Sequence, residues 1–245
     1  MIPGFHAVRE SLLNPKRQVH EIWIEVGKKG SRVDEVLGLA KARGVLAVFM
    51  SRGDIERVVP GINHQGIVAL TGEFSYVDME DLVRRSLDAR GFRLIVAADH
   101  ITDEGNLGAL MRTAAFFGVQ GLILPRDRSA QVTGKLLKRT SGAYLHLPVA
   151  QVVNLGRALD TLRDGGFWII GAAGEGPASI YDFDWNRDTV LILGSESKGL
   201  SKSVRDRCDE LVRIPGEGKV ESLNVSVASG IILAEIMRQR LKGIP

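Results

Sequence analysis

The sequence predicts an α/β protein built around a largely parallel sheet. Short β-branched and apolar runs alternate with amphipathic stretches along the whole chain, which is the pattern of strand–helix units. The composition is that of an ordinary globular protein, with 44% hydrophobic and 25% charged residues. A chain of 245 residues accommodates one large domain, or a small domain joined to a larger one.

The expected strands fall into two series. The first series closes a small unit and consists of residues 19–25, 45–49 and 66–70. The second series is longer and consists of residues 93–99, 121–125, 145–149, 167–173, 189–194 and 211–215. Residues 71–80 separate the two series, because they carry turn and helix-start signals but no strand period. We therefore predict a small domain over residues 1–72, a linker with a connecting helix over 73–91, and a larger domain over 92–245.

The C-terminal stretch predicts a helix over residues 222–241. Its apolar residues recur at helical spacing and it ends in basic residues, which suit a helix C-terminus. Serine and asparagine at its start are typical of a helix N-terminus, where free backbone N–H groups can hold an anion or a polar ligand edge. We expect this helix to pack on the larger sheet.

Cysteine usage and hydropathy exclude several classes. The single cysteine, Cys208, cannot form an internal disulfide, and without a CxxC pair a thiolate metal site is not expected. No apolar run approaches the roughly 18 residues of a membrane span, and residues 1–10 lack the features of a secretion signal. We therefore expect a cytoplasmic protein with no membrane partner.

Charge is nearly balanced overall but locally basic. The net charge of +3 tolerates a polyanionic partner without demanding one. Between residues 112 and 139 a single acid, Asp127, accompanies six cations, namely Arg112, Arg126, Arg128, Lys135, Lys138 and Arg139. A solvated helix face and a phosphate-contacting face both fit this stretch.

Three glycine-containing segments follow predicted strands of the second series. They span residues 99–113, 194–200 and 214–228. Open α/β sheets bind ligands at the carboxyl ends of their strands, so these segments are candidates for a site. Neither a GxGxxG turn after the first strand of either series nor a GxxxxGKS/T loop is present, which argues against a dinucleotide dehydrogenase and a P-loop enzyme.

The same segments carry a family resemblance. NLGALMRT, LILGSESKGL and IPGEGKVESLNVSVA resemble the three motifs of the TrmH (SpoU) family of RNA 2'-O-ribose methyltransferases, within the SPOUT superfamily, and the likeness covers residues 93–240. GFHAVRESL and NHQGIVA, near the front of the chain, resemble the L30e-like substrate-binding domain of the RlmB branch of that family. Members of that branch methylate a guanosine of 23S rRNA.

The resemblance implies a fold, a methyl donor and partners. It implies a trefoil-knotted SPOUT methyltransferase domain with a small N-terminal L30e-like α/β domain, working as a homodimer on large-subunit rRNA or a ribosome-assembly intermediate. The implied donor is S-adenosylmethionine, with no metal. The residues implied to bind it are Ala172, Ala173, Gly194, Glu196, Gly199, Ile214 and Leu223.

The resemblance also implies roles for individual residues. The implied catalytic residues are Asn106, Arg112, Glu196, Ser222 and Asn224. Because a guanidinium stays protonated in proteins, we expect Arg112 to grip the phosphate beside the target ribose rather than to act as a base. The expected RNA-binding cations are Lys16, Arg17, Lys28, Lys29, Arg126, Arg128, Lys135, Lys138 and Arg139, with Arg32 beside them.

Two alternatives remain. Within the same class, the substrate could be tRNA, although tRNA enzymes of the family tend to lack the front domain. From a different class, the chain could be a non-catalytic RNA-binding ribosome-assembly factor. A binder has no need of all five catalytic residues together, and a donor-binding titration separates the two classes.

Overall fold

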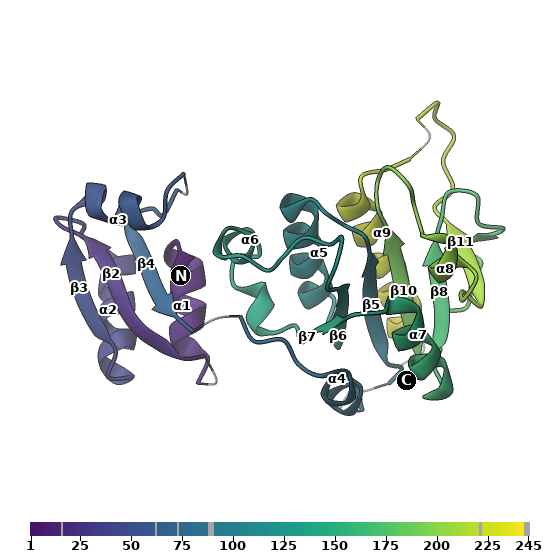
Figure 1. The fold of residues 1–245 in the computed structure, drawn as a ribbon, viewed down its shortest axis with the longest axis horizontal. Coiled ribbons are helices and arrows are strands. Elements are labelled where there is room, and N and C mark those ends of the chain that lie inside the picture. The colour runs from purple at the N-terminus through teal and green to yellow at the C-terminus, as the bar shows by residue number, and fades with distance from the viewer. Residues whose placement is uncertain (16, 62, 73, 88–90, 221, 243–245) are drawn as a thin grey trace. The chain divides into compact units, whose positions relative to one another are not determined.

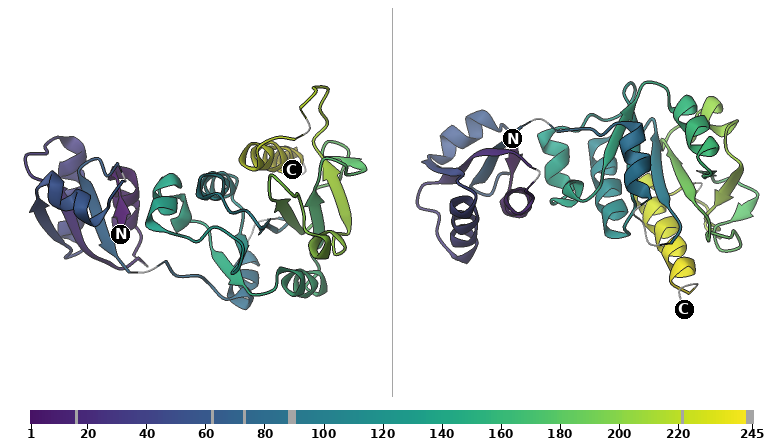
Figure 2. Two further views of the ribbon diagram at one scale, coloured as in Figure 1. Left: turned by 45° about the horizontal axis from the view of Figure 1, so that its top comes forward. Right: turned by 90° about the horizontal axis from the view of Figure 1, so that it is seen from below.

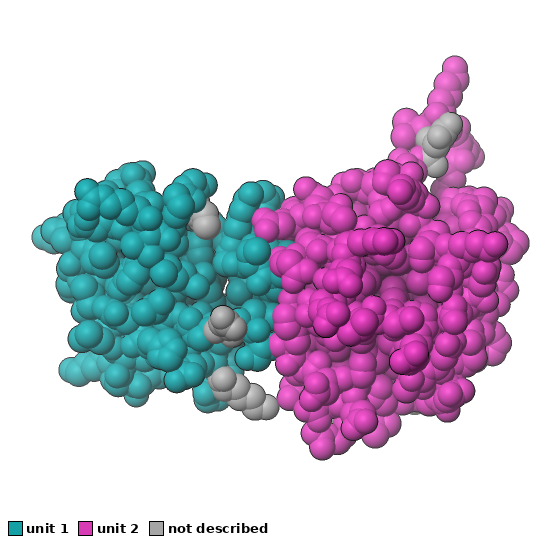
Figure 3. Space-filling view, in the orientation of Figure 1, with its two compact units in different colours: residues 1–75, 132–146 teal, residues 76–131, 147–245 magenta. Residues whose placement is uncertain are grey.

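The computed structural model describes residues 1–15, 17–61, 63–72, 74–87, 91–220 and 222–242. The chain divides into two compact units, which Figure 3 colours separately. The first is Met1–Ser75 with Val132–His146, and the second is Tyr76–Gln131 with Leu147–Pro245. The predicted domain boundaries follow chain order and do not anticipate the return of the second segment to the first unit, so they stay a prediction.

The first unit contains a four-stranded sheet in the order β1-β4-β2-β3. Its strands are β1 (Ile2–Pro3), β2 (Val19–Glu25), β3 (Leu46–Met50) and β4 (Ile67–Thr71). Its helices are α1 (Phe5–Leu13), α2 (Ser31–Ala42), α3 (Arg52–Val58), α6 (Gly134–Arg139) and the 3-10 turn η1 (Ala143–Leu145). Strands β2 and β3 are parallel, whereas β1 and β2 each run antiparallel to β4. Apolar side chains of α1 and α2 pack on one face of this sheet, and Ile55 of α3 packs on the other.

The second unit contains a seven-stranded parallel sheet in the order β7-β6-β5-β10-β8-β11-β9. Its strands are β5 (Leu94–Asp99), β6 (Gly121–Pro125), β7 (Val149–Val152), β8 (Trp168–Ala172), β9 (Ala178–Ser179), β10 (Thr189–Gly194) and β11 (Glu210–Arg213). Its helices are α4 (Met79–Ser86), α5 (Glu104–Phe116), α7 (Leu155–Asp164), α8 (Lys202–Arg205) and α9 (Val225–Lys242). This sheet confirms the predicted α/β class (Figure 1).

Helices cover both faces of the larger sheet. Figure 2 shows α5 and α9 on one face and α4 and α7 on the other. On the second face, Leu82 of α4 and Leu159 of α7 join a fully buried cluster with Ile95, Ile123 and Ile192 of the strands. Strands buried on both faces read as continuous apolar runs, which is why this series was predictable from sequence.

Most predicted elements are confirmed, but one strand is wrong. The strand predicted over 145–149 begins only at Val149, because residues 143–145 form η1 and Tyr144 is buried in the first unit. Strands β1 and β9 were not predicted, since two residues carry no period. The last helix begins at Val225 rather than at Ser222, because the Asn224 side chain accepts a hydrogen bond from the backbone N–H of Ser226.

Candidate active site

Three neighbouring strands of the larger sheet end together. In the register of the sheet, Gly194 at the end of β10 pairs with Asp99 at the end of β5, and Leu193 pairs with Ala172 at the end of β8. The loops that follow these strands therefore begin at one edge of the sheet. This arrangement confirms that the first two motif segments lie together.

Helix α5 places Asn106 at this edge. The side chain of Asp103 caps the helix by accepting a hydrogen bond from the backbone N–H of Asn106, at 2.8 Å. Glu104 is the first residue of the helix and the acidic residue of its first turn. An acidic side chain is stabilising at this position because the N-terminus of a helix carries partial positive charge.

A tight loop after β10 carries Glu196. Ser195 and Gly199 exchange two backbone hydrogen bonds, of 2.8 and 3.1 Å, and Gly199 has a φ of 62°. The loop folds back so closely that a Cβ on Gly194 would lie 2.3 Å from the backbone carbon of Gly199. Only glycine fits at position 194, so the sequence fixes where Glu196 is presented.

Asn106, Glu196 and Asn224 form a hydrogen-bonded group, here called the site cluster. The Glu196 Oε1 atom accepts from Asn106 Nδ2 at 2.7 Å and from Asn224 Nδ2 at 2.5 Å. Asn224 Nδ2 also donates to Asn106 Oδ1 at 3.0 Å. One carboxylate oxygen thus links α5, the loop after β10 and the start of α9. None of the three side chains is buried, so the cluster is open to a ligand.

Sequence reasoning missed Asp99, which supports this edge from inside. The carboxylate is fully buried, and its Oδ2 accepts from the backbone N–H of Ser201 at 2.6 Å. Its Oδ1 lies 2.5 Å from His100 Nδ1, and His100 adopts a left-handed φ of 60°. Asp99 therefore anchors the far end of the loop that carries Glu196. The available signal was an acid directly after the apolar run of residues 94–98.

The expected donor-binding residues are distributed around the same edge. Ala172, Ala173 and Gly194 are half-buried at the ends of β8 and β10, and Ile214 is half-buried just after β11. Gly199 is exposed, and Leu223 keeps 47% of its surface. Backbone groups and short apolar side chains dominate this set. Such a set of groups fits a ligand held by backbone hydrogen bonds and apolar contacts.

Arg112 and Ser222 do not join the site cluster. Both are exposed, and neither has a hydrogen-bond or ion-pair partner within the described ranges of the chain. Arg112 lies six residues after Asn106 on α5. That separation is about 9 Å along the helix axis and about 120° around it. The structure brings three of the five expected catalytic residues together.

The expected RNA-binding cations divide between the two units. Arg126 and Arg128 lie in the second unit, whereas the other described cations of this set lie in the first. Lys16 lies outside the described residues. Arg17 is half-buried and donates to Thr71 Oγ1 and the Gly72 carbonyl, at 3.1 and 3.0 Å, which gives it a structural role. Lys138 donates to the Asn63 carbonyl, and burial lowers the pKa of its ammonium group. The remaining cations are exposed, namely Lys28, Lys29, Arg126, Arg128, Lys135 and Arg139.

Comparison with known proteins identifies the family. The family model of the SpoU rRNA methylases matches residues 93–234, and that of the RNA 2'-O ribose methyltransferase substrate-binding domain matches residues 1–77. The chain belongs to the SpoU rRNA methylase family.

Within the part of the chain that the structure describes, no helix is long and apolar enough to cross a membrane. The same part contains no group of three His, Cys, Asp or Glu side chains that could hold a metal ion.

Relatives within this SpoU family cover nearly the whole chain. The 23S rRNA (guanosine-2'-O-)-methyltransferase RlmB of Pseudomonas aeruginosa is 38% identical over 97% of this chain and 95% of its own. An uncharacterised tRNA/rRNA methyltransferase of Synechocystis is 39% identical over 98% of this chain, which spans 62% of that relative's length. The crystal structure of the SpoU methyltransferase AviRb from Streptomyces viridochromogenes, in complex with the cofactor AdoMet, is 26% identical. It has a TM-score of 0.82 and covers 99% of this chain and 90% of its own.

Proposed function

We propose that this protein is an S-adenosylmethionine-dependent RNA ribose 2'-O-methyltransferase that methylates a guanosine of 23S rRNA in the cytoplasm. The observation that carries the proposal is the site cluster, because three motif segments of the family meet there at the carboxyl edge of a parallel sheet. Similarity to a 23S rRNA guanosine methyltransferase supports the substrate, and similarity to an AdoMet-bound SpoU structure supports the donor.

The finer features of the fold belong to the same proposal. A trefoil knot is supported by β10, which lies between β5 and β8, both of which precede it in the chain, and by Asn224, which lies beyond β11 in the chain and bonds to Asn106 of α5. An L30e-like N-terminal domain is supported by the small mixed sheet of the first unit and by its match to the substrate-binding family.

The donor site is assigned to the strand-end residues. Ala172, Ala173, Gly194, Gly199, Ile214 and Leu223 would hold S-adenosylmethionine with backbone groups and apolar contacts. When bound, the donor supplies a methyl group that its sulfonium centre already activates for transfer. What the protein must add is alignment of the ribose 2'-oxygen, which is a weak nucleophile, and easier loss of its proton.

The site residues divide this work. Glu196 holds the two asparagine amides, so the cluster fixes the loops that shape the donor and ribose pockets. Ser222, in the segment before Asn224, would shape the same pocket. Arg112 is exposed and without a partner in the described part of the chain, so its planar guanidinium is available to grip an RNA phosphate. There it would also stabilise negative charge developing on the 2'-oxygen.

The assembly is proposed to be a homodimer that acts on large-subunit rRNA or an assembly intermediate. Two exposed apolar side chains on α5 and α9 support association, with 82% of Phe116 and 51% of Val227 accessible. Sedimentation of the purified chain tests this directly. A mass equal to one chain at micromolar concentration would contradict the dimer.

The decisive experiment maps ribose methylation across the rRNA and tRNA of a deletion strain. We expect loss of a single 2'-O-methylguanosine in 23S rRNA, restored by the wild-type chain but not by Arg112→Ala. Loss of a tRNA methyl group instead would establish the tRNA alternative. The Synechocystis relative is named as a tRNA/rRNA methyltransferase, which is compatible with either substrate. A chain that binds no S-adenosylmethionine in calorimetric titration would be the non-catalytic factor.

A further inference from the structure

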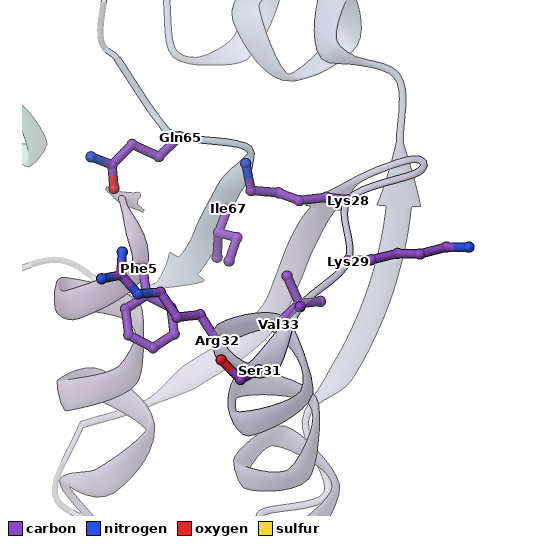
Figure 4. Close-up of a pocket in the computed structure, with 9 residues that line it drawn as sticks. Phe5, Lys28, Lys29, Ser31, Arg32, Val33, Gln65 and Ile67 are labelled. Atoms are coloured by element: carbon purple, nitrogen blue, oxygen red, sulfur yellow. The ribbon is translucent and has the colours of Figure 1, made fainter.

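The first unit contains a pocket that the proposed chemistry does not use. It has a volume of about 370 Å³, and its lining includes Phe5, the β2–α2 turn and Gln65 (Figure 4). A volume of this order is typical of sites for small organic ligands. Every lining residue belongs to the first unit, so the pocket is complete without the second.

Three cations surround this pocket, and their side chains point in different directions. Figure 4 shows the Lys28 ammonium over the pocket, on the side of Gln65, and the Arg32 guanidinium at the Phe5 ring. Lys29 points away from the pocket in the same view. Within the described chain, none of the three has an acidic side chain at ion-pair distance. Lys28 and Arg32 thus present two cations without an ion pair to one cavity, and the Glu25 carboxylate lies close to the Lys28 stem. Two cations at one cavity favour an anionic ligand group.

The backbone around the pocket is shaped to present these groups. Gly30 and Ser31 line the pocket at the start of α2, where Gly30 has a φ of 122° and no side chain caps the helix. The backbone N–H groups of Val33 and Asp34 are already bonded to the Gly30 carbonyl. Gly66 has a φ of 72°, and a Cβ there would lie 2.6 Å from Glu25 Oε2 and 2.8 Å from Lys28 Cδ, so both side chains pass close to the glycine. Gln65 itself has a φ of 53°, which is unusual for a residue other than glycine.

The remaining lining suits a planar, aromatic group. The Arg32 guanidinium lies 5.5 Å from the centroid of the Phe5 ring, and Val33 and Ile67 provide buried apolar surface beside it. A guanidinium plane next to an aromatic ring is a surface on which nucleic-acid bases stack. The Gln65 side-chain amide offers both a donor and an acceptor to a base edge.

We propose that this pocket binds one unpaired nucleotide of the RNA substrate. Its phosphate would lie between Lys28 and Arg32, and its base would stack on Arg32 and contact the Gln65 amide. The inference deepens the proposed function and rests on it, because it assigns to the first unit the recognition of unpaired RNA rather than a general attraction to phosphate. A paired base cannot enter such a pocket without leaving its helix.

The test is a binding titration with the full chain and two fluorescein-labelled RNAs. One probe is a hairpin with an unpaired loop, and the other is a continuous duplex of equal length. We expect the wild type to prefer the hairpin. Arg32→Ala is expected to weaken hairpin binding by about 5- to 150-fold, the range that corresponds to removal of a base-stacking side chain. Lys28→Ala should weaken it by roughly three- to tenfold, as loss of a phosphate contact does.

Lys41→Ala is the matched control, because Lys41 is an exposed lysine of α2 in the same unit and does not line the pocket. We expect a change below about twofold from this variant, as for a charge that only adds to the general field. All three side chains are exposed, so equal melting temperatures will show that the variants fold. Equal losses for Lys28→Ala and Lys41→Ala, or no preference for the hairpin, would overturn the proposal.

Donor binding and methyl transfer, measured in parallel, separate the two proposals. If the wild type transfers no methyl group to RNA, and Arg32→Ala has lost the hairpin preference that the wild type shows, the proposed enzyme is refuted and the proposed pocket is supported. A wild type that methylates rRNA while all three variants bind the hairpin equally well would refute the pocket alone.

Discussion

Removing the carboxylate of the site cluster provides a sharp test of how the active-site edge is organised. Glu196→Ala deletes the one atom, Oε1, that accepts hydrogen bonds from Asn106 at 2.7 Å and Asn224 at 2.5 Å. Each bond is exposed to solvent, so we assign it about 0.5–1 kcal/mol, the lower part of the usual range for a net hydrogen bond. The two together give about 1–2 kcal/mol, which is a factor of about 5–30 in an equilibrium.

The two hydrogen bonds of Glu196 order the loops at the strand ends and contribute little to the stability of the core. We therefore expect Glu196→Ala to weaken S-adenosylmethionine binding by about 5- to 30-fold in calorimetric titration, with little change in the melting temperature. Amide hydrogen exchange of residues 195–201 should accelerate by a similar factor. Glu196→Gln keeps an oxygen acceptor and should lose roughly threefold.

The control removes a similar charge nearby. Glu217 is exposed in the segment that leads to Asn224, and it has no hydrogen-bond or ion-pair partner in the described ranges. Glu217→Ala should leave donor affinity and exchange unchanged. If Glu196→Ala behaves like Glu217→Ala in both measurements, the site cluster does not order this edge.

Three further predictions concern residues of the second unit. Gly194→Ala should destabilise the fold by roughly 1–3 kcal/mol in denaturant titration, because the added Cβ would clash with the backbone of Gly199. Gly218→Ala should be neutral, because a Cβ there would meet nothing closer than 4.0 Å. Asp99→Asn should cost about 1–3 kcal/mol by leaving buried hydrogen-bond partners poorly matched, measured in the same way. Burial raises the pKa of the Cys208 thiol to about 11, so at pH 8 the folded protein should be alkylated far more slowly than the unfolded chain, with rates rising only as the pH approaches that value.

The strands of the second unit were predictable because burial on both faces leaves apolar runs with clear ends. Residues 121–125 and 189–194 match the predicted bounds of β6 and β10. The strand predicted over residues 145–149 was wrong because tertiary packing, rather than the local pattern, determines the structure there. Leu145 ends the 3-10 turn η1, whose Tyr144 hydroxyl lies 3.1 Å from Ser11 Oγ, a partner more than a hundred residues away. No local pattern contains that information.

The site was predictable to the same extent, for the same reason. Parallel strands end at one edge of a sheet, so the sequence predicted that the segments carrying Asn106 and Glu196 lie close together. The strand order was not predictable, because nothing local places β10 between β5 and β8. The role of Asp99 depends on that order, since its bond to Ser201 crosses between β5 and the loop after β10.

Helix geometry separates Asn106 from Arg112, although the sequence analysis had assigned both to one catalytic group. Asn106 and Arg112 share α5, but their six-residue spacing directs the side chains about 120° apart, so a straight helix cannot turn both into one cluster. Asn106 faces the strand-end loops, as its bond to Glu196 shows. Arg112 is exposed and has no hydrogen-bond or ion-pair partner among the described residues, so it is available to a ligand. Arg112→Ala should therefore abolish methyl transfer and leave donor affinity nearly intact, whereas Glu196→Ala should lower both. Equal losses of donor affinity in the two variants would show that the guanidinium, too, shapes the donor edge.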